Sequence, residues 1–213
     1  MKRTIIFSAL LMGFSVFVNA QTLSAPMEKA IEACTNLSNA IGATTTSQLK
    51  AANKELKAAD IVDFGDLWLE KGKDLSVDGH FIFDEEFIDS LIVNRKVLSF
   101  SSQYAKKRSN RASTSVNGRI KMTTKALKAG QNSIWKTVNR RNAEYAIIAE
   151  PGGLFTMTIR DDKGNVLYAE TVNNKKGEPV RKAKIQLPDK ATRIFIEVKN
   201  NGKNDASFAL LGN

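Results

Sequence analysis

The chain has 213 residues, one cysteine, one histidine and a formal net charge of +10 at neutral pH. A single cysteine excludes an intramolecular disulfide, and one histidine with one cysteine excludes most transition-metal cages, which need several such ligands. A net positive charge favours anionic partners through long-range attraction, although a charge of this size also serves simply to keep a protein soluble.

The first 20 residues have the pattern of a secretory signal peptide. Lys2 and Arg3 precede an apolar stretch at residues 5–18, and residues 18–20 have the small side chains of a cleavage site. The apolar stretch is too short to cross a bilayer, which takes about 20 residues. We therefore expect an exported protein, periplasmic or extracellular, that begins near Gln21 and has no membrane span. Nucleic acid is not an expected partner of an exported chain that carries no nucleic acid-binding motif.

Residues 24–59 have the apolar spacing of a helical hairpin. Ser24 is placed to cap the first helix, and Thr45 with Gln48 has the spacing of a capping box for the second. Apolar positions three and four residues apart form one stripe on each predicted helix. The stripes are Met27, Ala30, Cys34, Leu37 and Ile41, and then Leu49, Ala52, Leu56 and Ala59. Two such stripes joined by a short loop should face each other, so we expect Cys34 to be a core residue rather than a nucleophile.

Residues 60–115 carry less regular patterns of secondary structure than the helical hairpin does. Residues 67–69 are compatible with a short strand or with an apolar loop, and residues 79–83 predict a strand that contains His80. Acidic residues 84–86 are typical of a helix start, and the alternative is a set of carboxylates for acid–base chemistry or a cation. Residues 101–115 are rich in serine and basic residues, which predicts a linker between a mainly helical region (21–100) and a second domain (116–213).

From Val116 onward the apolar pattern has a period of two. About eight short strands fit into roughly a hundred residues, a density typical of a β-sandwich or jelly roll. Residues 145–149 should form a strand that is buried on both faces, and residues 161–164 a tight hairpin with Gly164 at positive φ. The predicted fold class is therefore α+β, with a helical region followed by an antiparallel sandwich.

Three segments of this half resemble the bacterial pre-peptidase C-terminal jelly-roll domains of secreted proteins. They are Ile159–Val166, with its Asp-x-x-Gly-type hairpin, Ile194–Asn200, which leads into an Asn-Gly loop, and Ser207–Leu210, with the pattern Ser-Phe-x-Leu. The resemblance covers residues 116–213. It implies a non-catalytic accessory module, a class that in some secreted proteins binds a matrix polymer.

No motif in the sequence predicts a catalytic residue, a metal ligand or a cofactor. The sequence contains neither a Gly-x-Ser-x-Gly elbow nor a glycine-rich phosphate loop, and a catalytic triad would have to use His80. Asp161, Asp162 and Asn165 carry oxygens that suit calcium, but their spacing first predicts a hairpin turn.

Trp68 and Trp135 are the candidate ligand-binding residues, because exposed tryptophan rings stack on sugars. The alternative for each is a buried packing anchor. We expect an exported, non-enzymatic binding or interaction protein whose partner is an envelope or extracellular glycan or another exported protein. An aromatic pair on one exposed sandwich face would support this function.

Two other functions compete with it. A small exported hydrolase would place its site between the two halves, using His80 with residues 84–86. A structural subunit of a larger assembly would show a broad apolar patch. The sequence leaves the oligomeric state open.

Overall fold

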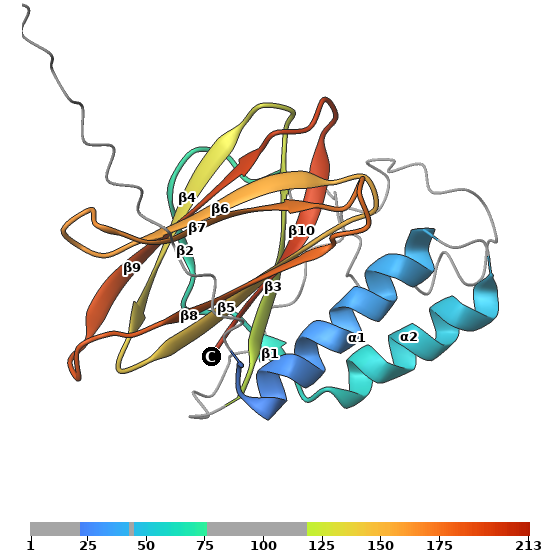
Figure 1. The fold of residues 1–213 in the computed structure, drawn as a ribbon, viewed down its shortest axis with the longest axis horizontal. Coiled ribbons are helices and arrows are strands. Elements are labelled where there is room, and N and C mark those ends of the chain that lie inside the picture. The colour runs from blue at the N-terminus through green and yellow to red at the C-terminus, as the bar shows by residue number, and fades with distance from the viewer. Residues whose placement is uncertain (1–21, 43–44, 76–118) are drawn as a thin grey trace, which may run out of the picture.

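The computed structural model describes residues 22–42, 45–75 and 119–213. Within them the fold is α+β, as predicted, with a helical hairpin packed against a sandwich of two β-sheets (Figure 1). The predicted strand at residues 79–83, the acidic helix start at 84–86 and the linker at 101–115 lie outside the described residues.

The two predicted helices are α1 (Ala25–Gly42) and α2 (Thr46–Ala58). Their apolar stripes are buried except at Ala59, which follows α2 and is partly buried. Cys34 lies in the core, with its Sγ 3.5 Å from the Sδ of Met122. The capping of α2 differs from the prediction. Thr45 is the N-cap residue, but its hydroxyl group donates to the side-chain oxygen of Gln48 and makes no bond to a backbone N–H, so the capping box does not form.

Eight strands follow residue 119, which is the number that the alternation predicted. They are β3 (Lys121–Leu127), β4 (Asn132–Asn139), β5 (Ala143–Ala149), β6 (Leu154–Arg160), β7 (Val166–Asn173), β8 (Val180–Ile185), β9 (Thr192–Asn200) and β10 (Ala206–Gly212). Their antiparallel pairs are nested along the chain: β6 with β7, β5 with β8, β4 with β9 and β3 with β10. Such nesting arises when one long hairpin rolls up over two sheets, which is the jelly-roll arrangement.

Two short strands from the N-terminal part extend the two sheets. β1 (Val62–Asp63) pairs in parallel with β3, and β2 (Trp68–Lys71) pairs antiparallel with β4. The first sheet has the order β1-β3-β10-β5-β8, and we call it the covered sheet. The second has the order β2-β4-β9-β6-β7, and we call it the open sheet. The region predicted as mainly helical therefore supplies an edge strand to each sheet.

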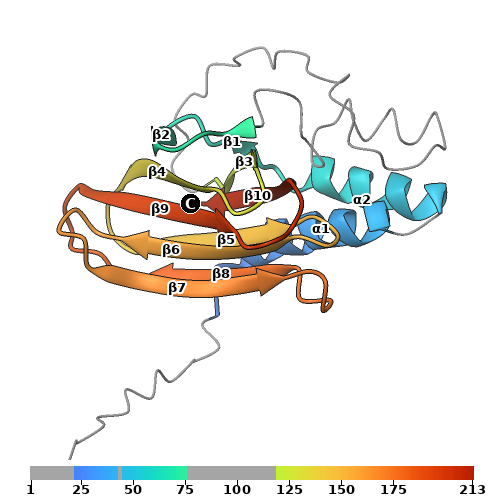
Figure 2. The ribbon, with the colours of Figure 1, turned by 90° about the horizontal axis from the view of Figure 1, so that it is seen from above.

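The two sheets enclose one apolar core, and the helices enclose a second one against the covered sheet. Every residue of β5 is buried, as predicted for a strand with both faces covered, because alternate residues point into the two cores. Both helices lie together on one side of the sandwich (Figures 1 and 2). In the described residues no helix packs on the outer face of the open sheet.

The hairpin between β6 and β7 has the predicted glycine geometry. Gly164 has a φ of +84°, and the register of the pair shifts between Ile159 and Arg160. Asp161 closes the turn by accepting the backbone N–H groups of Lys163 at 2.9 Å and Asn165 at 2.8 Å.

Candidate binding face

The outer face of the open sheet carries a row of aromatic, basic and apolar side chains that runs across the strands. The row consists of Trp68 (β2), Lys136 (β4), Phe195 (β9), Arg160 (β6) and Val166 (β7), each directly opposite the next in the sheet register. Paired residues in an antiparallel sheet point to the same face. We call this set the aromatic row.

The strand alternation places the aromatic row on the solvent side. Trp135, which flanks Lys136, and Ile194 and Ile196, which flank Phe195, are fully buried between the sheets. Phe195 itself is partly exposed, and the side chain of Trp68 is 50% exposed. Neighbouring strands lie about 4.8 Å apart, so Trp68 and Phe195, separated by one strand, are about 10 Å apart.

The same face carries further apolar side chains beside the aromatic row. Ile134 lies in the next row, opposite Glu197, and Val138, which is 48% exposed, lies opposite Arg193. An outward sheet face in contact with water is ordinarily polar. Several aromatic and aliphatic side chains at least partly exposed on one sheet face make this face a candidate place for another molecule to bind.

Basic side chains outnumber acidic ones on this face. The basic residues are Lys71, Lys136, Arg160, Arg193 and Lys199, and the acidic ones that pair with them are Glu70 and Glu197. Lys136 forms an ion pair with Glu70 at 2.5 Å, and Arg160 lies 3.8 Å from Glu197. Within the described ranges the other three basic residues form no ion pair, so the face presents a net positive charge.

The two tryptophans predicted from the sequence to bind a ligand lie in different environments. Trp68 lies on the open face, at the end of the aromatic row. The expectation for Trp135 as a ligand-binding residue is wrong, because its ring is fully buried and packs edge-on against Phe208 with the ring centres 5.9 Å apart. Trp135 is therefore a buried packing anchor, which was the alternative interpretation from the sequence. The second ring of the face is the partly exposed Phe195, which was not among the residues predicted from the sequence.

The burial of Cys34 fits a core residue rather than a nucleophile. Burial raises the pKa of its thiol to about 12, so the reactive thiolate is suppressed at neutral pH. The hydrolase hypothesis depends on His80 and residues 84–86, which lie outside the described residues, and it stays a prediction.

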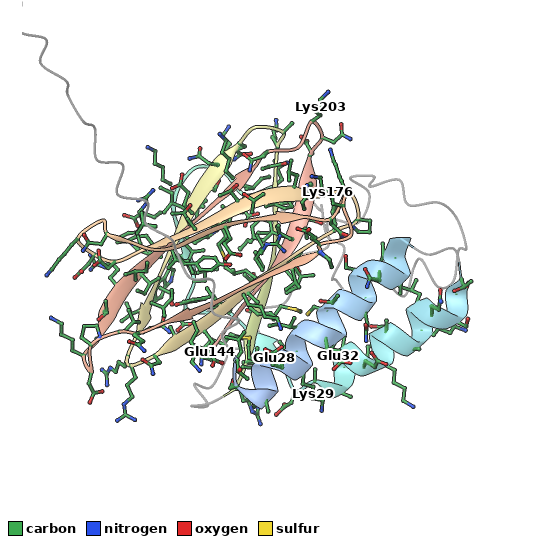
Figure 3. The ribbon with its side chains drawn as sticks, viewed as in Figure 1. Glu28, Lys29, Glu32, Glu144, Lys176 and Lys203 are labelled. Carbon is green, nitrogen blue, oxygen red and sulfur yellow. The ribbon has the colours of Figure 1, made fainter. Side chains whose placement is uncertain are left out.

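Glu144 and Glu150, two buried carboxyl groups, sit at opposite ends of β5. Six residues of extended strand separate them by about 20 Å, which is far beyond the roughly 5–9.5 Å between the two carboxyl groups of a glycosidase. Glu144 accepts the backbone N–H of Ser24 at 3.0 Å and its hydroxyl at 2.6 Å, beside the start of α1 (Figure 3). The side chain of Ser24, expected to cap α1, thus joins the helix to the sheet.

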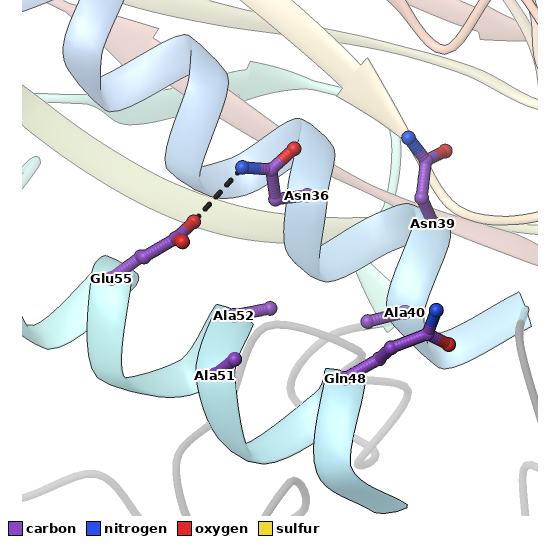
Figure 4. Close-up of a pocket in the computed structure, with 7 residues that line it drawn as sticks. All are labelled: Asn36, Asn39, Ala40, Gln48, Ala51, Ala52 and Glu55. Atoms are coloured by element: carbon purple, nitrogen blue, oxygen red, sulfur yellow. Dashed lines mark hydrogen bonds between the residues drawn. The ribbon is translucent and has the colours of Figure 1, made fainter. Parts of the chain in front are cut away.

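A shallow groove of about 350 Å³ lies between the two helices (Figure 4). Amide side chains of Asn36, Asn39 and Gln48 line it, and Asn36 donates a hydrogen bond to Glu55 at 2.9 Å across it. Its polar groups partly satisfy one another, so it offers weaker chemistry for a ligand than the open face does.

No group of three or more metal-ligating side chains occurs in the described part of the chain. The carboxylate of Asp161, considered for calcium, is engaged by its own turn, and the hydrogen bond from the Asn165 side chain is the main cause of its lowered pKa. Across the described residues no helix is both long enough and apolar enough to span a membrane.

No family model matches the sequence, and a search of curated proteins found no match. Solved structures with a similar fold do exist. They include the Yersinia pseudotuberculosis-derived mitogen (10% identity, 45% of this chain and 85% of that one, TM-score 0.34). They also include the pre-peptidase C-terminal domain of collagenase from Bacillus anthracis (13% identity, covering 43% of this chain and 87% of that one, TM-score 0.34). TmCBM61, solved in complex with β-1,4-galactotriose, is another (13% identity, covering 44% of this chain and 81% of that one, TM-score 0.30).

The resemblance to pre-peptidase C-terminal domains thus has a counterpart among the structural neighbours. At these identities and scores the likeness concerns the sandwich fold and supports no inference about a ligand.

Proposed function

We propose that this chain is an exported, non-enzymatic binding module that holds a glycan on the outer face of its open sheet. The observation that carries the proposal is the aromatic row, which places Trp68 and Phe195 on one exposed face about 10 Å apart. That spacing of the strand backbones is comparable with the repeat of a disaccharide in an extended polysaccharide, so one glycan chain that runs across the strands would reach both side chains. The proposal of export rests on the signal-peptide pattern of residues 1–20.

Physical chemistry favours a sugar polymer over a small molecule here. A small ligand needs a concave pocket that removes most of its surface from water, whereas this face is a sheet surface. Aromatic rings that stand on a sheet give an extended ligand apolar contact at fixed intervals, and their two side-chain torsions cost little entropy to order.

The test compares Trp68→Ala with Leu69→Ala. Leu69 is the next residue of β2, is 45% exposed and lies opposite Trp135, a residue of the inner face, so it is a matched control that lies off the aromatic row. We expect Trp68→Ala to weaken, by at least about tenfold, binding to the polysaccharides that retard the unaltered chain in affinity electrophoresis. Leu69→Ala should leave binding within about twofold of the unaltered chain.

Tryptophan fluorescence gives an independent readout, because Trp135 is buried and Trp68 is the exposed ring. A bound glycan should change the emission of Trp68, and the change should disappear in Trp68→Phe. The proposal is rejected if no polysaccharide of a broad neutral and acidic panel binds, or if Trp68→Ala and Leu69→Ala bind equally well.

A further inference from the structure

The charges of the open face narrow the class of ligand. We infer that the ligand is an anionic polysaccharide of the uronate type, which lies across the strands with sugar rings on Trp68 and Phe195 and carboxylates at Lys136 and Arg160. This inference rests on the proposed function and deepens it by naming the substrate class.

The first support is the alternation within the aromatic row. Trp68, Lys136, Phe195 and Arg160 follow one another at the strand spacing, so each basic group lies next to an aromatic ring. A polyuronate offers the complementary alternation, because each sugar has an apolar ring face and a carboxylate at its edge. A neutral glycan would gain nothing from the charges of Lys136 and Arg160, which would keep only their partners on the protein, Glu70 and Glu197.

The second support is that the existing ion pairs of the row can give way. Lys136 and Glu70 are both more than a third exposed, and such surface pairs contribute little in water. Arg160 reaches Glu197 only at 3.8 Å, while Glu197 accepts a shorter hydrogen bond of 2.9 Å from Asn132. The guanidinium group of Arg160 therefore keeps donors available for a carboxylate, which it can bind with two parallel hydrogen bonds.

The third support is the charge on either side of the row. On β9 the outward residues are, in order, Arg193, Phe195, Glu197 and Lys199, so Phe195 has Arg193 on one side and Glu197 on the other, with Lys199 beyond Glu197. Arg193 and Lys199 form no ion pair in the described part of the chain. Lys71 adds a basic group one row from Trp68. The aromatic row thus lies in a positive field, which attracts a polyanion and steers it toward the rings.

The experiment uses the full chain and one polymer in two forms: a polyuronate and the same polymer after reduction of its carboxyl groups to alcohols. We expect carboxyl reduction to weaken binding by at least about tenfold. Raising the salt concentration, which shortens the Debye length from about 10 Å at 0.1 M to about 3 Å at 1 M, should weaken binding to the polyuronate only.

Charge-removing variants locate the effect on the face. Lys136→Gln and Arg160→Gln should each lower affinity for the polyuronate by about two- to fivefold, and should lower affinity for the reduced polymer by clearly less. Lys29→Gln is the matched control, because Lys29 is exposed on α1, on the helical side of the molecule (Figure 3). It removes the same charge and should change neither affinity.

The outcomes separate this inference from the proposed function. If the reduced polymer binds as tightly as the polyuronate and both need Trp68, the glycan module stands and the anionic ligand is wrong. If the polyuronate binds but Trp68→Ala has no effect and Lys29→Gln weakens binding as much as Lys136→Gln, the attraction is that of a polycation for any polyanion, and both proposals fail. If neither form binds and no other glycan does, the proposed function itself fails.

Discussion

Glu150 has an environment that differs strongly from that of an ordinary surface carboxylate. It follows β5 directly, is 5% exposed, and accepts a hydrogen bond from the hydroxyl group of Ser207 at 2.8 Å. Burial raises its pKa to about 7, although the hydrogen bonds from Ser207 act in the opposite direction. As the pH rises from about 4.5, the unfolded chain loses this proton before the folded chain does, so folding becomes less favourable until the pH passes about 7.

Glu150→Gln should therefore stabilise the protein at high pH and not at low pH. The amide has the size of the acid, keeps an acceptor for Ser207 and cannot ionise. At pH 4 the melting temperatures of the variant and the unaltered chain should agree. At pH 8 the variant should gain about 3 kcal/mol, or roughly 5–10 °C. Thermal unfolding at several pH values measures this, with Glu32→Gln on the exposed face of α1 as control. The prediction would be contradicted if the melting temperatures of Glu150→Gln and the unaltered chain differed by the same amount at every pH.

The sequence located some residues well and others not at all, and the difference has a physical cause. Cys34 could be assigned to a core because helical periodicity is a local property, and three- and four-residue spacing is enough to define a face. Trp68 and Trp135 could not be told apart, because β4 has apolar residues on both faces: Ile134 and Val138 outward, Trp135 inward. Which face is inward is decided by the register with β9, about 60 residues away.

At the scale of elements, the binding face depends on how β2 is held at the edge of the open sheet. Gly72 follows β2 at a φ of +95°, and a Cβ there would come within 2.7 Å of the backbone oxygen of Asn132 in β4. The chain beyond it is tied to the same strand, since Lys73 donates its N–H to the hydroxyl group of Ser133 at 3.0 Å. Only glycine lets the chain pass this close to β4, so Gly72 sets the position of Trp68 four residues earlier.

Gly72→Ala should therefore weaken glycan binding although Gly72 is not part of the aromatic row. The matched control is Gly177→Ala, because Gly177 also has a positive φ, +75°, but no atom lies within 4 Å of its added Cβ. Both variants should lose about 1 kcal/mol from backbone strain, and Gly72→Ala should lose a further 1–2 kcal/mol from the clash. Denaturant unfolding with affinity electrophoresis checks this. Equal binding by the two variants would show that β2 adjusts without moving Trp68.

The aromatic row also shows which elements sequence patterns can predict. The eight strands of the second half were predicted because each has its own alternation, and the nested jelly-roll pairing is compatible with that count. The row itself joins Trp68, Lys136, Phe195 and Arg160, which come from four strands spread over more than a hundred residues. Phe195 carried one signal, since it is an aromatic residue between two isoleucines on a strand with one solvent face. No local pattern places its three partners beside it.

For the whole molecule, β5 links the helical hairpin to the sandwich. Tyr145 and Ile147 point into the core between the sheets, and Ala146 and Ile148 point into the core under the helices. Ser24 and Glu144 add a hydrogen-bonded contact between α1 and the same strand. Because one strand contributes to both cores, loss of packing in one core should weaken the other, so we expect the helices and the sandwich to unfold in one transition rather than as separate domains.

Leu37→Ala in a Trp68→Phe background tests this coupling. Leu37 is a fully buried residue of α1 in the core between the helices and the covered sheet. The remaining tryptophan, Trp135, lies in the other core, so its fluorescence measures the unfolding of the sandwich. Removing the buried side chain should cost about 2–5 kcal/mol. Because the cores unfold together, the fluorescence of Trp135 should follow the same denaturation curve as the helical circular dichroism signal, with both midpoints lowered equally. Lys57→Ala, an exposed change on α2, should leave both midpoints in place. A lower midpoint for the helical signal alone would mean that the hairpin detaches from an intact sandwich.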